Sequence, residues 1–179
     1  MLSKIIFSSL LMSHLLYGIS VWGGSPNNCL QRLSVLQKKA IRHVFNVNYN
    51  SHTNSLFYQL RCLQLHDSYI LQCSKLGYKR KLNSLPYYHA SKLMFNRELR
   101  QSRTRQDDCI ALINPSSFLK INSFNYKIGT AWNNIPFDIK EKINFKKRSE
   151  KGFSNMMKSF LLKSYDQPCS ILNCYICNR

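Results

Sequence analysis

The clearest pattern in the sequence is helical and runs between residues 30 and 46. Its apolar positions recur at three- and four-residue steps, the spacing that places side chains on one face of an α-helix. These positions are Leu30, Leu33, Leu36, Ala40, Ile41 and Val44. The cationic positions fall largely off that face, and they are Arg32, Lys38, Lys39, Arg42 and His43. No acidic residue interrupts them. The pattern therefore predicts an amphipathic helix whose basic flank is either solvated or bound to an anion.

The residues that flank this stretch are typical of helix ends. Asn27 or Asn28 can accept hydrogen bonds from the free amides of a first turn, and Asn46 can adopt the left-handed conformation that closes a last turn. Thr53 or Asn54 can cap a second, short helix in the same way.

Further helices are predicted along the rest of the chain. One begins near Asp67 and ends before Pro86, since proline lacks the amide that a continuing helix needs. Its inner side carries Ile70, Cys73, Leu76 and Gly77, and its outer side carries Lys75, Lys79, Arg80 and Lys81. Others are expected over residues 88–100, from an N-cap at Ser123 to a stop at Pro136, and over residues 153–165. The short apolar runs 109–113 and 118–121 predict two brief strands or an extended hairpin. The expected fold is mainly α, a small helical bundle with a short β-hairpin or extended segment near the middle and a Cys-containing tail.

Residues 1–22 allow three interpretations. Lys4 followed by an apolar run to Trp22 has the order of a secretory signal peptide, and Gly18-Ile19-Ser20 can serve as its cleavage site. The same run is polar for a membrane span, because six of its eighteen residues are Ser, His or Gly. A buried amphipathic helix is the third interpretation. The pattern by itself leaves signal peptide and core helix open.

Composition changes the picture mainly through charge. The chain has 179 residues with 26 Lys and Arg against 8 Asp and Glu, a formal net charge of +18. Such a surface repels itself and favours a polyanion, either nucleic acid or an acidic membrane face. At 44% hydrophobic residues, the chain can bury a core, which excludes wholesale disorder. Seven cysteines form an odd number that argues against a closed disulfide framework and for a reducing compartment. Four of them are expected to be buried thiols: Cys29, Cys62, Cys73 and Cys109.

Three motifs follow one another in the first third of the chain. Residues 14–23 read His-Leu-Leu-Tyr-Gly-Ile-Ser-Val-Trp-Gly, residues 33–42 read Leu-Ser-Val-Leu-Gln-Lys-Lys-Ala-Ile-Arg, and residues 49–57 read Tyr-Asn-Ser-His-Thr-Asn-Ser-Leu-Phe. In this order and spacing they resemble the region downstream of the polymerase palm in reverse transcriptases of LINE-type (non-LTR) retrotransposons, jockey-like elements in particular. Weaker matches continue to Tyr165. Where the family has Tyr-x-Gly, this chain has Tyr126-Lys127-Ile128-Gly129.

The resemblance implies how the chain is divided into segments and that it is part of a longer protein. It implies a helical thumb-like segment over residues 1–82, a basic C-terminal helical segment over 83–165, and a Cys-containing tail over 166–179. The first helix would then be an internal thumb helix, with no signal peptide and no membrane span, and Met1 would start a truncated reading frame. Full-length relatives would be RNA-directed DNA polymerases, so a palm domain or a full-length element protein is a candidate partner. A nuclear or cytoplasmic location is expected.

The carboxylates of a polymerase are not evident in this sequence. A reverse transcriptase holds two Mg²⁺ ions with carboxylates, and its usual sequence signature is an aromatic residue, one spacer and two aspartates in a strand-turn-strand. Asp107-Asp108 is the only adjacent acidic pair, with no aromatic residue two positions before it. It is therefore expected to be a turn whose charge is balanced by Arg103 and Arg105. The histidines are dispersed, at His14, His43, His52, His66 and His89. We assign no catalytic residue and expect the chain not to be an enzyme.

The tail carries a pattern that is typical of metal sites. Cys169-x4-Cys174-x2-Cys177 places thiolates at a spacing from which one tetrahedral Zn²⁺ can be held. A structural zinc site needs four ligands, so a fourth would come from Cys109 or from a residue beyond Arg179. The alternative is a disordered tail with free thiols.

Two basic blocks predict nucleic-acid binding. Residues 75–105 hold nine Lys and Arg against one acid, and residues 140–163 hold eight against two. Cations that meet phosphates release condensed counterions, which favours contacts with the backbone of RNA or of an RNA–DNA duplex. The candidate residues are Lys38, Lys39, Arg42, Lys79, Arg80, Lys81, Arg103 and Arg105. No cofactor is required. The alternative function is that of a secreted or membrane-associated basic protein with residues 1–20 as its signal peptide.

Overall fold

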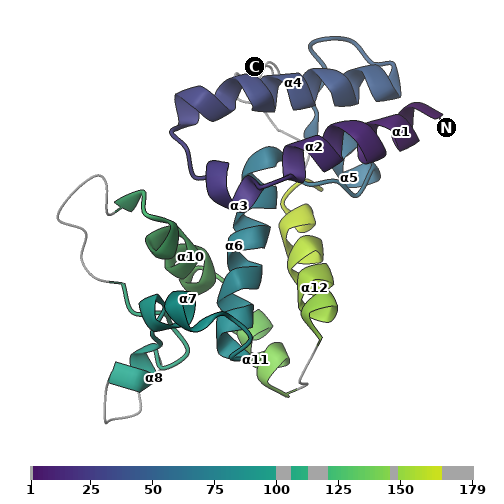
Figure 1. The fold of residues 1–179 in the computed structure, drawn as a ribbon. Helices are drawn as coiled ribbons and strands as arrows, with labels where there is room; N and C mark the ends of the chain where they lie inside the picture. The colour runs from purple at the N-terminus through teal and green to yellow at the C-terminus, as the bar shows by residue number, and fades with distance from the viewer. Residues whose placement is uncertain (1, 100–105, 113–120, 146–148, 167–179) are drawn as a thin grey trace. The chain divides into compact units, whose positions relative to one another are not determined.

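The computed structural model describes residues 2–99, 106–112, 121–145 and 149–166 as helices joined by loops (Figure 1). Within these ranges no strand forms, and one isolated antiparallel bridge joins Phe95 to Ile110. The predicted mainly helical fold is confirmed. Most of the second run of the predicted hairpin, 118–121, lies outside the described residues. In the first run, 109–113, Ile110 pairs with Phe95 instead.

The chain divides into two compact units. Unit 1 comprises residues 1–69 and 158–179, and unit 2 comprises residues 70–157. Helices α6 (Leu65–Lys81) and α12 (Glu150–Lys163) each contribute residues to both. These units are groups of residues in mutual contact. They do not test the predicted segments 1–82, 83–165 and 166–179, which stay a prediction.

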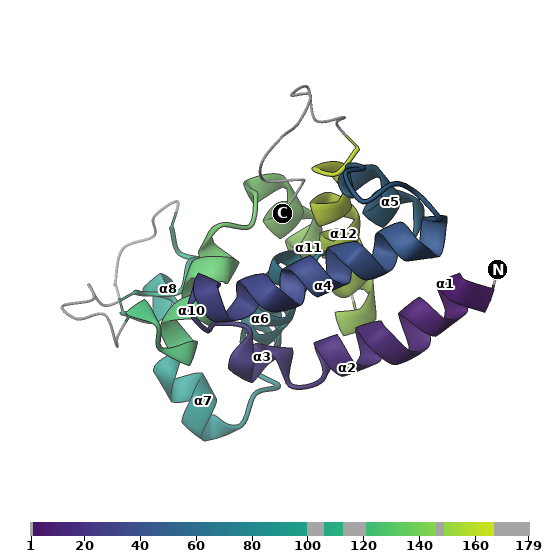
Figure 2. The same ribbon diagram turned by 90° about the horizontal axis from the view of Figure 1, so that it is seen from above.

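Unit 1 is built on an antiparallel pair formed by its N-terminal helices and α4. Its elements are α1 (Leu2–Ile6), the π-helix η1 (Phe7–Leu11), α2 (Met12–Leu16), α3 (Ile19–Trp22), α4 (Asn27–Phe45) and α5 (Asn54–Gln59). The N-terminal helices and α4 lie side by side and run in opposite directions in both views (Figures 1 and 2). Phe7, Met12 and Ile19 are buried, so the N-terminal helices supply core residues to unit 1.

A polar side chain of α4, Gln37, links this helix to the backbone of Leu63 and Leu65 and to Met12 of α2. It is buried in the middle of α4, where its Nε2 donates to the carbonyl oxygen of Leu63 at 3.1 Å. Its Oε1 accepts from the backbone N–H of Leu65 at 3.0 Å, and Nε2 also lies 3.4 Å from the sulfur of Met12. One amide thus satisfies two backbone groups that burial would otherwise leave unpaired.

The ends of α4 agree only in part with the sequence pattern. Asn46 has φ 51° and closes the helix in the left-handed conformation, as predicted. The prediction of an asparagine N-cap is wrong, because Pro26 occupies that position and no side chain caps the first turn. Leu36 was expected on the buried face, but it is exposed. Gln37 takes the inner position, since its amide has partners there.

Tyr165 fastens the end of α12 to the start of α6 within unit 1. Its hydroxyl donates to the Asp67 carboxylate and accepts from the backbone N–H of Gln64 at 3.1 Å. Its ring lies 6.3 Å from that of Phe57, centroid to centroid. Burial, and next the charge of Asp67, raise the pKa of Tyr165 above its ordinary value, so the hydroxyl stays protonated in the folded chain.

We expect Tyr165→Phe to lower the free energy of unfolding by about 1–3 kcal/mol at neutral pH, because two half-buried polar partners, Asp67 and Gln64, lose their hydrogen bond. The difference should shrink as pH rises above about 10, where the unfolded tyrosine ionises while the folded one does not. Urea unfolding of both proteins at neutral and at alkaline pH measures this. A difference that stays constant with pH would mean that the folded hydroxyl ionises normally.

Unit 2 packs around an aromatic core. Besides its parts of α6 and α12, it contains α7 (Tyr87–Lys92), α8 (Asn96–Leu99), α10 (Phe124–Asn133) and α11 (Phe137–Phe145). The rings of Tyr78 and Phe153 stack at 4.5 Å, and Trp132 lies 6.2 Å from Phe95 and 6.3 Å from Phe153. The predicted N-cap of α10 is confirmed, because the Ser123 hydroxyl accepts from the backbone N–H of Tyr126 at 3.4 Å.

The single helix predicted over residues 88–100 is interrupted. Helices α7 and α8 are separated by an extended step in which Leu93 and Phe95 are buried and Met94 is exposed. Side chains two residues apart share a face in extended backbone and not in a helix. Burying both Leu93 and Phe95 therefore requires the break, and it frees Phe95 for its bridge to Ile110.

Candidate nucleic-acid interface

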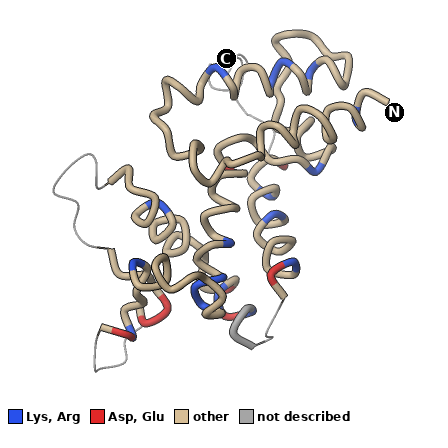
Figure 3. Tube along the Cα trace, viewed as in Figure 1, with Lys and Arg blue, Asp and Glu red and all other residues tan. Residues whose placement is uncertain are grey.

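The exposed face of α4 carries a row of cationic side chains. Arg32, Leu36, Lys39 and His43 are all exposed, and their steps of four, three and four residues place them on one stripe. At about 1.5 Å rise per residue, Arg32 and Lys39 stand roughly 10 Å apart along the helix. Lys and Arg positions mark α4 in Figure 3, and no acidic position does.

The charge of this region is unopposed in the sequence. Residues 1–66 contain six Lys and Arg and no Asp or Glu. A duplex presents a phosphate about every 3.4 Å of axis on each strand, so cations spaced along a straight helix can each approach one. We call Arg32 and Lys39 the α4 cationic row, and His43 continues the same exposed stripe.

The predicted binding residues of unit 1 differ in their surroundings. Lys39 is exposed, with its Nζ 5.7 Å from the centre of the Tyr49 ring. Lys38 is half-buried and makes interactions within the chain. Arg42 is only 4% exposed, and its Nε donates to the carbonyl oxygen of Ser51 at 2.9 Å. Arg42 therefore anchors the loop that follows α4, and we leave it out of the interface.

The predicted residues of unit 2 are engaged in ion pairs. Lys79 Nζ lies 3.3 Å from Glu150, and Lys81 Nζ lies 3.0 Å from Asp108. The Arg80 side chain is largely buried, and its Nη2 donates to both carboxylate oxygens of Glu98, at 2.8 and 2.7 Å. Arg103 and Arg105 lie outside the described residues. Of the eight predicted residues, Lys39 is the one that the structure presents on the α4 stripe.

The acidic pair Asp107-Asp108 lies in a turn, as expected. Asp108 is bound by Lys81 and by Arg97, whose Nη1 lies 3.5 Å away, while the predicted partners Arg103 and Arg105 are not described. Nearby, Lys140 is buried and donates to the carbonyl oxygen of Asn133 at 3.2 Å. Burial lowers the pKa of its ammonium group. This cluster is thus satisfied internally by its own ion pairs and hydrogen bonds.

The cysteines form no metal cluster in the part of the chain that the structure describes. Cys169, Cys174 and Cys177 lie outside that part, so the zinc prediction stays a prediction. Cys73 is fully buried and Cys62 and Cys109 are half-buried, whereas Cys29 is exposed on the first turn of α4, against expectation. Burial raises the pKa of the Cys62 thiol and keeps it protonated at neutral pH. No helix of the described ranges combines the length and hydropathy needed to cross a membrane.

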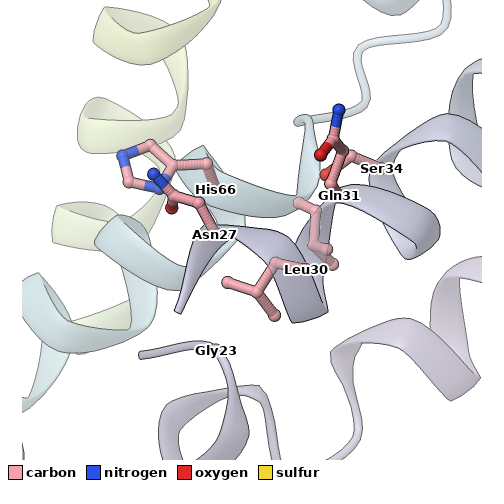
Figure 4. Close-up of a pocket in the computed structure, with 7 residues that line it drawn as sticks. Gly23, Asn27, Leu30, Gln31, Ser34 and His66 are labelled. Atoms are coloured by element: carbon pink, nitrogen blue, oxygen red, sulfur yellow. The ribbon is translucent and has the colours of Figure 1, made fainter. Parts of the chain in front are cut away.

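A hollow of about 380 Å³ opens near the start of α4. Figure 4 shows Asn27 and His66 close together on one side, Gln31 and Ser34 on the other, and Leu30 between them. These groups offer hydrogen bonds but no lysine or arginine, so this hollow does not account for the excess of positive charge. We assign it no ligand.

Arg32 and His43 were predicted on the basic flank of this helix, but they were left out of the predicted binding residues. Their spacing from Lys39 was available in the sequence. What hid the row was Leu36, an apolar residue in the middle of it, which was assigned to the core.

Comparisons of the chain with models of protein families, with curated protein sequences and with solved structures find no match.

Proposed function

We propose that this chain is a nucleic-acid-binding module that resembles the thumb and downstream region of a LINE-type reverse transcriptase. It holds RNA or an RNA–DNA duplex through backbone phosphates. The observation that carries the proposal is the α4 cationic row, an exposed stripe in a stretch of 66 residues without one acid. A partner palm domain or full-length element protein would supply the polymerase carboxylates, and we assign the chain no catalytic step.

The burial of the first helices favours this function over secretion. Phe7, Met12 and Ile19 are each at most 5% exposed in unit 1. A signal peptide is removed after translocation, so its loss would take these side chains out of the core and leave a cavity. A nuclear or cytoplasmic location follows from the same proposal. Mass spectrometry of the intact expressed protein separates the two functions, because a product that begins at Val21 supports the secreted alternative.

We expect Arg32→Gln combined with Lys39→Gln to weaken binding to an RNA–DNA hybrid duplex by about 10-fold or more at about 0.1 M salt. The slope of log affinity against log salt should fall by about 2, since each lost phosphate contact removes about 0.9. Fluorescence anisotropy of a labelled hybrid, titrated at several salt concentrations, gives both quantities.

The matched control is Lys142→Gln with Lys151→Gln, which removes the same charge from exposed positions on α11 and α12. It should leave the slope nearly unchanged. Equal losses from both pairs would mean that affinity is determined by the total charge or by the basic block 140–163 as well, and not by the α4 cationic row. Wild-type protein that ignores the hybrid even at low salt would refute the proposed function.

A further inference from the structure

Helix α7 presents two adjacent tyrosines to solvent. Tyr87 is 87% exposed and Tyr88 is 69% exposed, values far above those of the core aromatics. His89 follows them, with its ring 5.4 Å from that of Tyr88 in an edge-on arrangement. Large flat side chains exposed in a pair leave apolar surface in water that a stacking partner would cover.

Lys92, at the other end of the same helix, connects the tyrosines to a hollow. Its Nζ lies 5.9 Å from the centre of the Tyr88 ring, and its side chain is exposed. It also lines a cavity of about 290 Å³ together with Leu93, Leu112, Asn125 and Tyr126. The Lys92 ammonium group therefore lies near the exposed ring of Tyr88, and the Lys92 side chain also lines the hollow, whose walls are partly apolar and partly polar.

We propose that this surface, Tyr87, Tyr88 and Lys92, binds an unpaired stretch of RNA. The rings offer faces on which successive bases stack, and Lys92 is placed to meet the phosphate between them. Paired bases already stack within a duplex and cannot use these faces, so the ligand must be single-stranded.

Charge and hydrogen bonding identify the occupant. Helix α7 itself carries no acidic residue, and the charge of Glu98, which follows in α8, is neutralised by its two bonds to Arg80. Ser123 and Asn125, at the rim of the same hollow, provide hydroxyl and amide groups that can bond a 2′-hydroxyl, which DNA lacks. The choice of ligand rests on the proposed function, but the residues are different from the α4 cationic row and lie in the other unit.

The test compares a labelled oligouridine of about 12 nucleotides with a hybrid duplex, both by fluorescence anisotropy. Tyr87→Ala with Tyr88→Ala should weaken oligouridine binding at least about 30-fold, since the stacking faces for two bases are lost. Binding of the hybrid should change by less than about twofold. Tyr87→Phe with Tyr88→Phe keeps both ring faces and should bind oligouridine nearly as the wild type does.

The matched control is Tyr17→Ala, because Tyr17 is nearly as exposed as Tyr87, at 85%, but belongs to unit 1. It should leave oligouridine binding unchanged. Ultraviolet cross-linking of wild-type protein to oligouridine, followed by peptide mass spectrometry, should identify Tyr87 or Tyr88.

The outcomes separate this inference from the proposed function. Oligouridine affinity that is insensitive to the double alanine variant, or equal binding of oligothymidine and oligouridine, overturns the single-stranded RNA surface while leaving the hybrid result intact. Tyrosine-dependent binding of oligouridine by a protein that ignores the hybrid supports the α7 surface and refutes the duplex function.

Discussion

Trp132→Ala is expected to lower the free energy of unfolding by about 3–5 kcal/mol, which is the usual cost of removing a fully buried tryptophan. Whole domains are stable by only about 5–15 kcal/mol. The variant should therefore unfold unit 2 at much lower urea concentration, or leave it unfolded at physiological temperature.

The position of Trp132 explains the size of this effect. The side chain has no exposed surface, and its ring lies between those of Phe95 and Phe153. Its Nε1 donates to the carbonyl oxygen of Asp108 at 2.7 Å, so truncation removes a hydrogen bond as well as packing. That bond holds the 106–108 turn, in which Asp108 pairs with Lys81 and Arg97.

Far-ultraviolet circular dichroism during urea titration measures the loss. Phe137→Ala is the matched control, because Phe137 is an exposed aromatic residue of the same unit, and its removal should change stability by less than about 0.5 kcal/mol. A comparable loss in both variants would mean that Trp132 is not the centre of the core.

Gly77 provides a second, independent check. A Cβ at this position would lie 2.7 Å from Cε3 of Trp132. Gly77→Ala should therefore destabilise the wild type by about 1–3 kcal/mol. In the Trp132→Ala background the ring atoms are gone and the 3.0 Å approach to the Cβ of residue 132 remains, so the same change should cost clearly less than it does in the wild type. If the two substitutions had additive effects on the free energy of unfolding, Gly77 and Trp132 would not be in contact.

The helical fold could be predicted from the sequence because periodicity and turn residues act locally. Asn46, Ser123 and the break at Pro86 mark helix ends through their own backbone preferences, and all three agree with the structure. The interruption after Lys92 could not be predicted in this way. It depends on burying Leu93 and Phe95 together, and the bridge partner Ile110 lies 15 residues further along the chain.

The candidate interface was harder to predict, because a sequence does not show whether a lysine or arginine side chain faces solvent or is paired with a carboxylate. Arg42 and Arg80 were chosen for charge, and both turn inward to backbone oxygens. Gln37 shows the converse, because it is a polar residue outside the predicted apolar face that is buried and bonded to the backbone of Leu63 and Leu65. In each case the deciding partner is distant in sequence, or lies in a loop without a pattern of its own.

Arg80→Ala is expected to lower the free energy of unfolding by roughly 2–4 kcal/mol, because its removal leaves several partly buried acceptors without their donor. Nε donates to the carbonyl oxygens of Ala90 and Leu93, at 3.1 and 2.8 Å, and the guanidinium holds Glu98 through two bonds. These bonds join α6 to α7, to the extended step and to α8. Arg80→Lys should not restore stability, since an ammonium group cannot reproduce the planar fork.

Lys79→Ala is the matched control for Arg80→Ala, because it removes the same charge from the next residue of α6. Its side chain is more exposed, and its single ion pair with Glu150 should contribute less than about 1 kcal/mol. Urea unfolding compares the two variants, and anisotropy with the hybrid duplex shows whether either charge reaches a phosphate. If Arg80→Ala left stability unchanged and weakened duplex binding more than Lys79→Ala, Arg80 would be a ligand of nucleic acid. If it lowered stability while Lys79→Ala did not, Arg80 holds α7 in place, and with it the tyrosine pair.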